Sequence, residues 1–179
     1  MQSIKLILAY DGTAYAGWQV QPERTTIQGV LEATIERITG STSRTLASGR
    51  TDAGVHALGQ VVGFRTESQL TPETLLRALN AELPEDIAVL EAARVDDGFH
   101  PIRDAVSKRY RYVIHDGPVR DIFERNYCWH VKNHLEAQAM ERAARCLLGR
   151  HDFSSFESAG APRQDSIRTI TDISVTRSP

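Results

Sequence analysis

The first half of the chain alternates between short apolar runs and helical periodicities. Residues 4–10 (IKLILAY) form a nearly continuous apolar run that ends at an Asp-Gly pair, which is typical of a buried strand and a turn. Residues 27–38 then place isoleucine, leucine and valine on one helical face. Thr25 or Thr26 can cap the start of this helix, and Gly40 can close its end. We therefore expect a buried strand followed by a helix.

The following segments extend this pattern. Residues 46–51 and 59–66 each predict a strand, separated by a glycine-containing turn. A second helix is predicted from Thr71 as its cap and Pro72 at its first position, and it stops before Pro84. A further strand over residues 87–95 completes the order β-α-β-β-α-β. This order predicts a ferredoxin-like α+β unit.

The second half of the chain begins a similar but shorter pattern. Residues 110–115 alternate as a strand with one buried face would, and residues 127–131 can form its partner. Residues 135–148 carry apolar side chains at helical spacing, with Gly149 as the expected C-terminal cap. A last strand is suggested by Ile170, Ile173 and Val175. We therefore predict two units, residues 1–97 and residues 98–179, the second an incomplete α+β unit.

Composition changes this picture little. The 179 residues are 41% hydrophobic and 25% charged, which is ordinary for a folded globular protein. No run of eighteen apolar residues and no leader pattern occurs, so we expect a cytoplasmic protein without a membrane partner. Cys128 and Cys146 stand far apart and are expected to be reduced, mostly buried thiols. The six histidines lack ligand spacing, so no metal is expected.

Charge is more informative locally than globally. The net charge of −2 does not favour a polyanion as partner. Residues 98–120, however, hold five cations against two anions, namely Arg103, Lys108, Arg109, Arg111 and Arg120 against Asp104 and Asp116. This segment can supply a basic surface for nucleic acid, or it can be a solvated strand face with stray arginines.

The sequence SGRTDAGVH at residues 48–56 carries the strongest chemical signal. Gly49 and Gly54 bracket a cation and a carboxylate, Arg50 and Asp52, and glycine allows the tight or left-handed backbone that such a turn needs. On pattern alone, Asp52 is more simply interpreted as a turn former that bonds its own backbone. The alternative is a catalytic carboxylate held on a turn between two strands.

Resemblance to a known family favours the catalytic interpretation. The run GRTDAGVHA resembles the signature of the TruA-type tRNA pseudouridine synthases, in which the aspartate of this run is the essential catalytic residue. Other segments resemble that family in the same order along nearly the whole chain: YDGTAYAGWQVQ at residues 10–21, TIQGVLE at 26–32, GQVV at 59–62, NAELPEDI at 80–87, KRYRY at 108–112, LLGRHDFSSF at 147–156 and RTI at 168–170.

The resemblance implies a pseudouridine synthase fold and an isomerase that converts uridine to pseudouridine at positions 38–40 in the anticodon stem-loop of tRNA. It implies Asp52 as the catalytic carboxylate, acting as a nucleophile on the ribose or in a proton-abstraction route. Tyr110 would stack on the uracil, Arg50 would fill the gap left by the flipped base, and His56 would contact RNA or stabilise the turn. No cofactor is implied, because the reaction involves no redox change and no group donor. A homodimer that binds tRNA is also implied.

Two departures from the family pattern keep an alternative open. Where the family has FHAR, this chain has FHPI, with Arg103 one position later. Beyond Arg177 the family continues through a further strand, a helix carrying an arginine near the catalytic aspartate, and more sheet, so the chain is expected to be C-terminally truncated. The alternative function is therefore a non-catalytic RNA-binding fragment. A metal-dependent hydrolase built on Asp52 and His56 lacks the further ligands it would need.

Overall fold

The computed structural model describes residues 1–157 and 165–178 and divides the chain into two compact units. The first unit spans residues 1–110 and the second residues 111–179. The division predicted from the sequence, after residue 97, stays a prediction. No helix in the described part of the chain is both long and apolar enough to cross a membrane.

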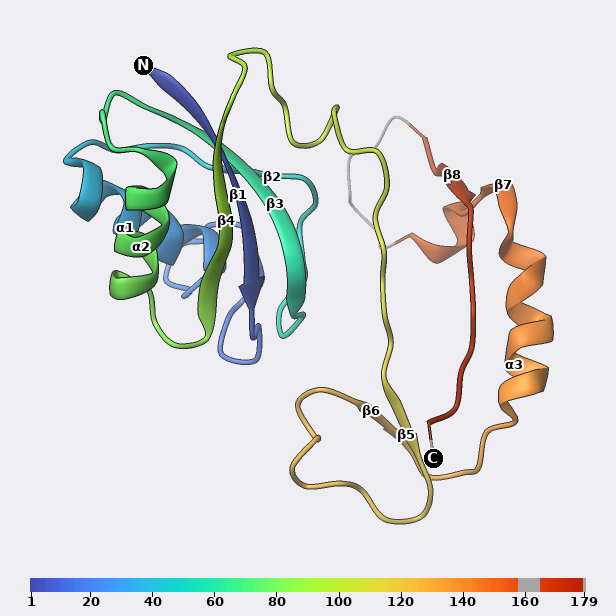
Figure 1. The fold of residues 1–179 in the computed structure, drawn as a ribbon. Helices are drawn as coiled ribbons and strands as arrows, with labels where there is room; N and C mark the ends of the chain where they lie inside the picture. The colour runs from blue at the N-terminus through green and yellow to red at the C-terminus, as the bar shows by residue number, and fades with distance from the viewer. Residues whose placement is uncertain (158–164, 179) are drawn as a thin grey trace. The chain divides into compact units, whose positions relative to one another are not determined.

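The first unit is an antiparallel sheet with two helices on one face (Figure 1). Its elements follow in the order β1 (Gln2–Tyr10), α1 (Ile27–Thr39), β2 (Leu46–Ala47), β3 (Ala57–Thr66), α2 (Pro72–Glu82) and β4 (Ile87–Val95). The strands lie side by side in the order β2-β3-β1-β4. The predicted succession of strands and helices in this half of the chain is confirmed. β2, however, covers only two of the six residues predicted for that strand.

Alternation along β1 explains which face of the sheet is buried. Ile4, Leu6, Leu8 and Tyr10 are all at most 4% exposed, and they share one face because side chains of a strand alternate. The same face of β3 contributes Val62 and Phe64, which pair with Leu6 and Ile4. The helices cover this face with the apolar residues Ile27, Leu31, Ile35, Leu75 and Leu79. The core of the first unit therefore lies between the sheet and its two helices.

Capping residues set the ends of both helices as predicted. The side chain of Thr26 accepts a hydrogen bond from the backbone N–H of Gly29 at the start of α1, and Gly40 ends that helix with φ of 72°. Thr71 caps α2 in the same way, with Pro72 at the first helical position. These local signals explain why the sequence predicted the helix bounds closely.

The segment after β4 folds back over the opposite face of the sheet. An added Cβ at Gly63 of β3 would lie 2.9 Å from Cγ of Pro101 and 3.3 Å from a ring carbon of Phe99. Pro101 is buried at this contact. The absence of a side chain at Gly63 therefore lets Phe99 and Pro101 pack closely on β3. This packing holds the segment that immediately precedes Ile102.

The second unit consists of shorter elements. β5 (Ile114–Asp116) pairs in parallel with β6 (Trp129–Val131), and β7 (Gly149–Asp152) pairs antiparallel with β8 (Ile167–Ile170). α3 (Ala137–Ala144) and a short 3₁₀ turn, Arg145–Leu147, lie between β6 and β7 in the chain. A second 3₁₀ turn, Ser154–Phe156, lies between β7 and β8. In α3, whose eight residues are all described, none is buried.

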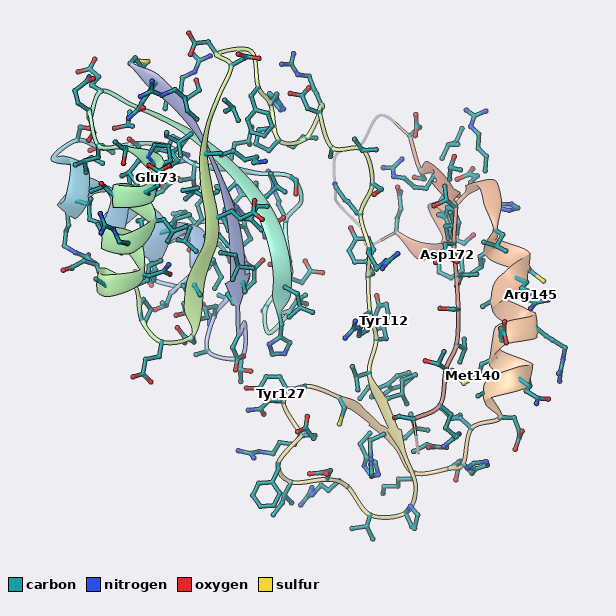
Figure 2. The ribbon with its side chains drawn as sticks, viewed as in Figure 1. Glu73, Tyr112, Tyr127, Met140, Arg145 and Asp172 are labelled. Carbon is teal, nitrogen blue, oxygen red and sulfur yellow. The ribbon has the colours of Figure 1, made fainter. Side chains whose placement is uncertain are left out.

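Three predictions for this half of the chain are wrong. Residues 110–113 do not form a strand, since β5 begins only at Ile114; Tyr112 projects from this stretch and is 84% exposed (Figure 2). α3 ends at Ala144 and not at Gly149, because the chain tightens into a 3₁₀ turn that Leu148 ends. Of the last strand predicted at Ile170, Ile173 and Val175, only Ile170 lies in a strand, β8, and the chain is not a strand from residue 171 onward. Alternation describes a side-chain pattern, whereas a strand also needs a hydrogen-bonded neighbour.

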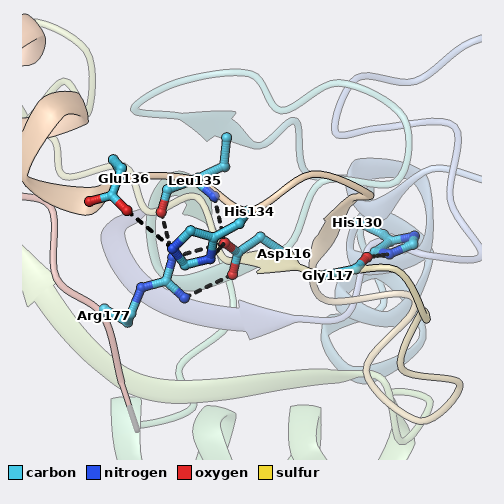
Figure 3. A network of polar contacts seen from close by, with 7 residues as sticks. All are labelled: Asp116, Gly117, His130, His134, Leu135, Glu136 and Arg177. Atoms are coloured by element: carbon cyan, nitrogen blue, oxygen red, sulfur yellow. Dashed lines mark hydrogen bonds and ion pairs between the residues drawn. The ribbon is translucent and has the colours of Figure 1, made fainter.

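A polar cluster ties three segments of the second unit together (Figure 3). The guanidinium of Arg177 donates to both carboxylate oxygens of Asp116 over 2.9 and 2.8 Å, and to the carbonyl of Leu135 over 2.6 Å. The N–H of Leu135 donates to Asp116 over 2.7 Å, and Nδ1 of His134 lies 3.1 Å from the same carboxylate. These contacts hold the pKa of Asp116 well below its usual range, chiefly through the hydrogen bonds from Arg177.

Candidate active site

The loop of residues 48–56, hereafter the 48–56 loop, connects β2 to β3 at one end of the sheet. Its second half is a turn in which the N–H of Val55 donates to the carbonyl of Asp52 over 3.1 Å. Gly54 has φ of 77°, a left-handed conformation that favours glycine, and its N–H donates to the carbonyl of Tyr15. The predicted need for glycine is confirmed at Gly54, whereas Gly49 has no left-handed φ.

The backbone is held on both sides of Arg50. On one side, the side-chain amide of Gln60 donates to the carbonyl of Gly49, and its oxygen accepts from the hydroxyl of Ser48 over 2.9 Å. On the other side, the N–H of Trp18 donates to the carbonyl of Thr51 over 2.9 Å. Residues from the β1–α1 connection and from β3 therefore fix the peptide units that flank Arg50.

Tyr10 adds a side-chain contact to the same stretch. Its hydroxyl lies 2.9 Å from Oγ1 of Thr51, at the buried end of β1. Burial raises the pKa of the Tyr10 hydroxyl, although hydrogen bonds with Thr51 and Gln60 act in the opposite direction. The hydroxyl is therefore neutral at physiological pH and can donate as well as accept. Gln60, at 9% exposure, shares the buried face with Tyr10.

Two glycines allow the β1–α1 connection to pack against the 48–56 loop. An added Cβ at Gly12 would lie 2.1 Å from the carbonyl oxygen of Val55. At Gly17, whose φ is 94°, it would lie 2.7 Å from the carbonyl oxygen of Thr51. Side chains at these positions would collide with backbone atoms of the loop. The glycines of the YDG and GW segments thus determine how closely the loop is supported.

His56 is engaged with the same connection. Its Nδ1 lies 3.0 Å from a carboxylate oxygen of Asp11 and 3.2 Å from the backbone nitrogen of Gly12. Asp11 also accepts hydrogen bonds from the backbone and the hydroxyl of Thr13. Of the two roles considered for His56, turn stabilisation is the one that these contacts favour.

The charged residues of the 48–56 loop face solvent. Arg50 and Asp52 are both exposed, and within the described parts of the chain the Arg50 side chain makes no hydrogen bond or ion pair. Tyr110 lies at the end of the first unit, is 77% exposed, and has no hydrogen bond to the loop in the described chain. Lys108 lies nearer, with Nζ 3.4 Å from where a Cβ would stand at Gly49. Arg50, Asp52 and His56 therefore share the 48–56 loop, where His56 contacts the β1–α1 connection and the two charged side chains face solvent.

The donor set does not suggest a metal centre. Among residues 1–157 and 165–178, no group of three histidine, cysteine or carboxylate side chains is placed to hold a metal ion. Cys128 is partly buried and Cys146 exposed, and both are free thiols; the expectation that both are mostly buried is wrong for Cys146.

Gln60 and Thr51 were missed as supporting residues by the sequence analysis. A signal for Gln60 was present, because it lies at the same period of two as Val62 and Phe64, which places its polar side chain on the buried face of β3. A buried amide needs hydrogen-bond partners, and Gly49 and Ser48 of the loop are those partners.

Comparison with known proteins assigns this arrangement to a family. The family model described as tRNA pseudouridine synthase matches residues 6–102, which include the second half of β1, the 48–56 loop and β4. The chain belongs to the tRNA pseudouridine synthase family.

Similar curated proteins carry the name tRNA pseudouridine synthase A. The protein from Thermoanaerobacter sp. (strain X514) is 41% identical over 177 residues, which cover 99% of this chain and 72% of that protein. The one from Halalkalibacterium halodurans is 48% identical over 178 residues, covering 99% and 68%. The one from Moorella thermoacetica is 48% identical over 179 residues, covering 99% and 73%.

Proposed function

We propose that this chain is a tRNA pseudouridine synthase, an isomerase that converts uridine to pseudouridine in the anticodon stem-loop of tRNA, with Asp52 as its catalytic carboxylate. Family membership and the names of its relatives support the reaction class. The observation that carries the residue assignment is the exposed Asp52 on a turn whose preceding backbone is held from β1, β3 and the β1–α1 connection.

The reaction explains why a rigid carboxylate is useful. The N1–C1′ bond of uridine breaks, the uracil turns while bound, and C5 bonds to C1′; C5 loses a proton and N1 gains one. Asp52 acts as a nucleophile on the ribose or in a proton-abstraction route during this exchange, and in either case its distance from the reacting atom must be held within a fraction of an ångström. The turn closed by the Val55 N–H fixes the Asp52 backbone for this purpose.

The other site residues are assigned supporting roles. The target base must leave its stack, and the planar guanidinium of Arg50 fills the gap that it leaves. Tyr110 stacks on the uracil; its 77% exposure leaves the ring face open to a base. His56 stabilises the turn through Asp11 and Gly12.

The same proposal covers fold and assembly. We assign residues 1–97 to a ferredoxin-like unit, and the strand order β2-β3-β1-β4 supports this assignment. We assign residues 98–179 to a second α+β unit. The synthase is proposed to bind tRNA as a homodimer, and light scattering of the purified chain would give its mass.

Mapping of modified tRNA tests the function. An unmodified tRNA transcript is incubated with the purified chain and then treated with a reagent that marks pseudouridine specifically. The proposal predicts product at uridines of the anticodon stem-loop with the parent chain and none with Asp52→Ala. Circular dichroism of the variant should match the parent, because Asp52 is exposed.

The same experiment separates the RNA-binding alternative. If the parent chain binds the transcript but leaves no pseudouridine under enzyme excess, the chain is a binding module and not a synthase. If Asp52→Ala forms product as fast as the parent, another residue carries the chemistry.

A further inference from the structure

A pocket of about 430 Å³ lies beside the 48–56 loop, on the side of Gly49 and Arg50. It lies along the edge strand β2, and Ile102 from the segment after β4 also lines it. Its volume is within the range of about 300–1,000 Å³ that is usual for small-ligand sites. Arg44, which immediately precedes Thr45 at the entry to β2, supplies a second guanidinium.

The backbone beside Arg44 is anchored to α1. The carboxylate of Glu32 accepts from the Thr45 N–H over 2.7 Å and from the Thr45 hydroxyl over 3.0 Å. The side-chain amide of Gln28, 5% exposed, donates to the carbonyl of Thr45 over 3.0 Å. Three hydrogen bonds therefore fix Thr45, the residue next to Arg44. In the same way, hydrogen bonds from Gln60 and Trp18 fix Gly49 and Thr51, the two residues next to Arg50.

The guanidiniums of Arg44 and Arg50 are not bound by other described residues of the chain. Within the residues that the structure describes, neither Arg44 nor Arg50 makes a side-chain hydrogen bond or an ion pair, and no carboxylate lines the pocket. The ammonium of Lys108 lies beside Gly49 and adds a third positive charge. Unpartnered guanidiniums on a fixed backbone are suited to bind a phosphate, because little ordering is needed when the anion arrives.

The pocket lining also includes apolar side chains. Leu46 is 40% exposed and Ile102 is 51% exposed, and both line the pocket. Exposed branched side chains beside a cationic lining fit the two parts of a nucleotide, whose base is flat and weakly polar and whose phosphate is anionic. Single-stranded RNA loops present bases unstacked and available for such contacts.

We propose that this pocket is a subsite for a nucleotide next to the target uridine, in which Arg44 binds a phosphate and the base rests on Leu46 and Ile102. The inference rests on the proposed function, since that function names RNA as the substrate. It adds Arg44 and Ile102 as RNA-binding residues that the sequence motifs did not indicate. Arg50 also lines this subsite and precedes Asp52 by two residues in the same loop.

Binding measured without turnover tests the phosphate contact. The dissociation constant of a tRNA transcript is measured for Asp52→Asn, alone and combined with Arg44→Gln, over a range of salt concentrations. Arg44→Gln is expected to weaken binding roughly ten- to a hundredfold, as loss of one charged hydrogen-bond donor does. A plot of the logarithm of the association constant against the logarithm of the salt concentration has a negative slope. For one lost phosphate contact this slope should become less steep by roughly 0.7–0.9. Arg77→Gln, which removes the same charge from an exposed position on α2, is the matched control.

A second pair of variants tests the base contact. Ile102→Ser should weaken binding by roughly two- to fivefold, because less apolar surface is buried, and should leave the salt slope unchanged. Leu90→Ser removes a side chain of similar exposure, 50%, from β4 outside the pocket and should have no effect. The proposal is overturned if Arg44→Gln behaves like Arg77→Gln, or if Ile102→Ser behaves like Leu90→Ser.

The two proposals fail in distinguishable ways. If the parent chain forms no pseudouridine yet Arg44→Gln and Ile102→Ser weaken tRNA binding as expected, the subsite stands and the synthase function fails. If product forms normally and neither Arg44→Gln nor Ile102→Ser changes the dissociation constant of tRNA, the synthase function stands and the subsite is wrong.

Discussion

The hydroxyl of Tyr10 lies 2.9 Å from Oγ1 of Thr51, the residue that separates Arg50 from Asp52. Tyr10 is the last residue of β1 and is 4% exposed, so a rigid core strand reaches the middle of the proposed catalytic loop. Because a catalytic group must be held within a fraction of an ångström, this contact is expected to influence turnover more than tRNA binding.

Tyr10→Phe tests this positioning role. Loss of the partly buried hydrogen bonds of the Tyr10 hydroxyl should lower the free energy of unfolding by about 1 kcal/mol or more. The kcat for pseudouridine formation should fall severalfold, while KM for tRNA stays within about twofold, because Tyr10 acts through Thr51 and does not touch the substrate. Urea unfolding and steady-state kinetics measure the two effects.

Tyr15→Phe is the control for that substitution. The hydroxyl of Tyr15 donates to Asp86 over 2.6 Å, and the substitution removes this bond but leaves the backbone contact between Tyr15 and Gly54 in place. A similar loss of stability with an unchanged kcat is expected. Equal effects of the two variants on kcat would show that Tyr10 stabilises the fold without positioning the loop.

Gly12→Ala tests the close approach of the β1–α1 connection. The new Cβ would stand 2.1 Å from the carbonyl oxygen of Val55, so the backbone must move. We expect a loss of roughly 1–3 kcal/mol in the free energy of unfolding together with a large loss of turnover. Gly98→Ala, where a Cβ would meet nothing within 4 Å, should change stability by less than about 0.5 kcal/mol. An active and stable Gly12→Ala variant would contradict the packing.

Arg177→Gln tests the polar cluster of the second unit through its pH dependence. The pKa of Asp116 is lower in the folded state than in the unfolded state, where it is about 3.9. Its contribution to stability is therefore fully present above about pH 4 and is lost as pH falls toward the folded-state pKa. The difference in Tm between parent and Arg177→Gln should be widest at neutral pH and narrow toward pH 3.

A surface ion pair provides the comparison for this prediction. Arg145 pairs with Glu141 over 3.1 Å, with 65% and 37% of the two side chains exposed. Arg145→Gln should lower Tm less than Arg177→Gln at pH 7, because exposed pairs are screened by solvent. A Tm difference between parent and Arg177→Gln that does not vary with pH would show that Asp116 is not the group involved.

The sequence predicted the first unit well because its signals are local. Thr26, Gly40, Thr71 and Pro72 each act within one helical turn, and the alternation along β1 needs no knowledge of its neighbours. The strand predicted over residues 110–115 failed for the opposite reason. Pairing depends on a partner elsewhere in the chain, and β5 finds one in β6 only from Ile114 onward.

The candidate site was predicted in part. The glycine requirement at Gly54 follows from the turn itself, and the motif identified Arg50 and Asp52 as its charged residues. The buried amide of Gln60 and the anchoring of Arg44 through Thr45 depend on contacts between residues distant in sequence. The period of two along β3 indicates that Gln60 is buried, but no periodicity or motif spacing identifies its hydrogen-bond partners or those of Thr45, which only the folded structure reveals.

The single-turnover rate of pseudouridine formation with Asp52→Asn tests the central claim most directly. Asparagine keeps the size of the side chain but removes its charge, so tRNA binding should persist while the catalytic group is lost. With enzyme in excess over an anticodon stem-loop transcript, the rate constant should fall by roughly 10²–10⁴-fold or more, the range for loss of one catalytic group. A rate constant within tenfold of the parent, with tRNA binding intact, would contradict the assignment of Asp52.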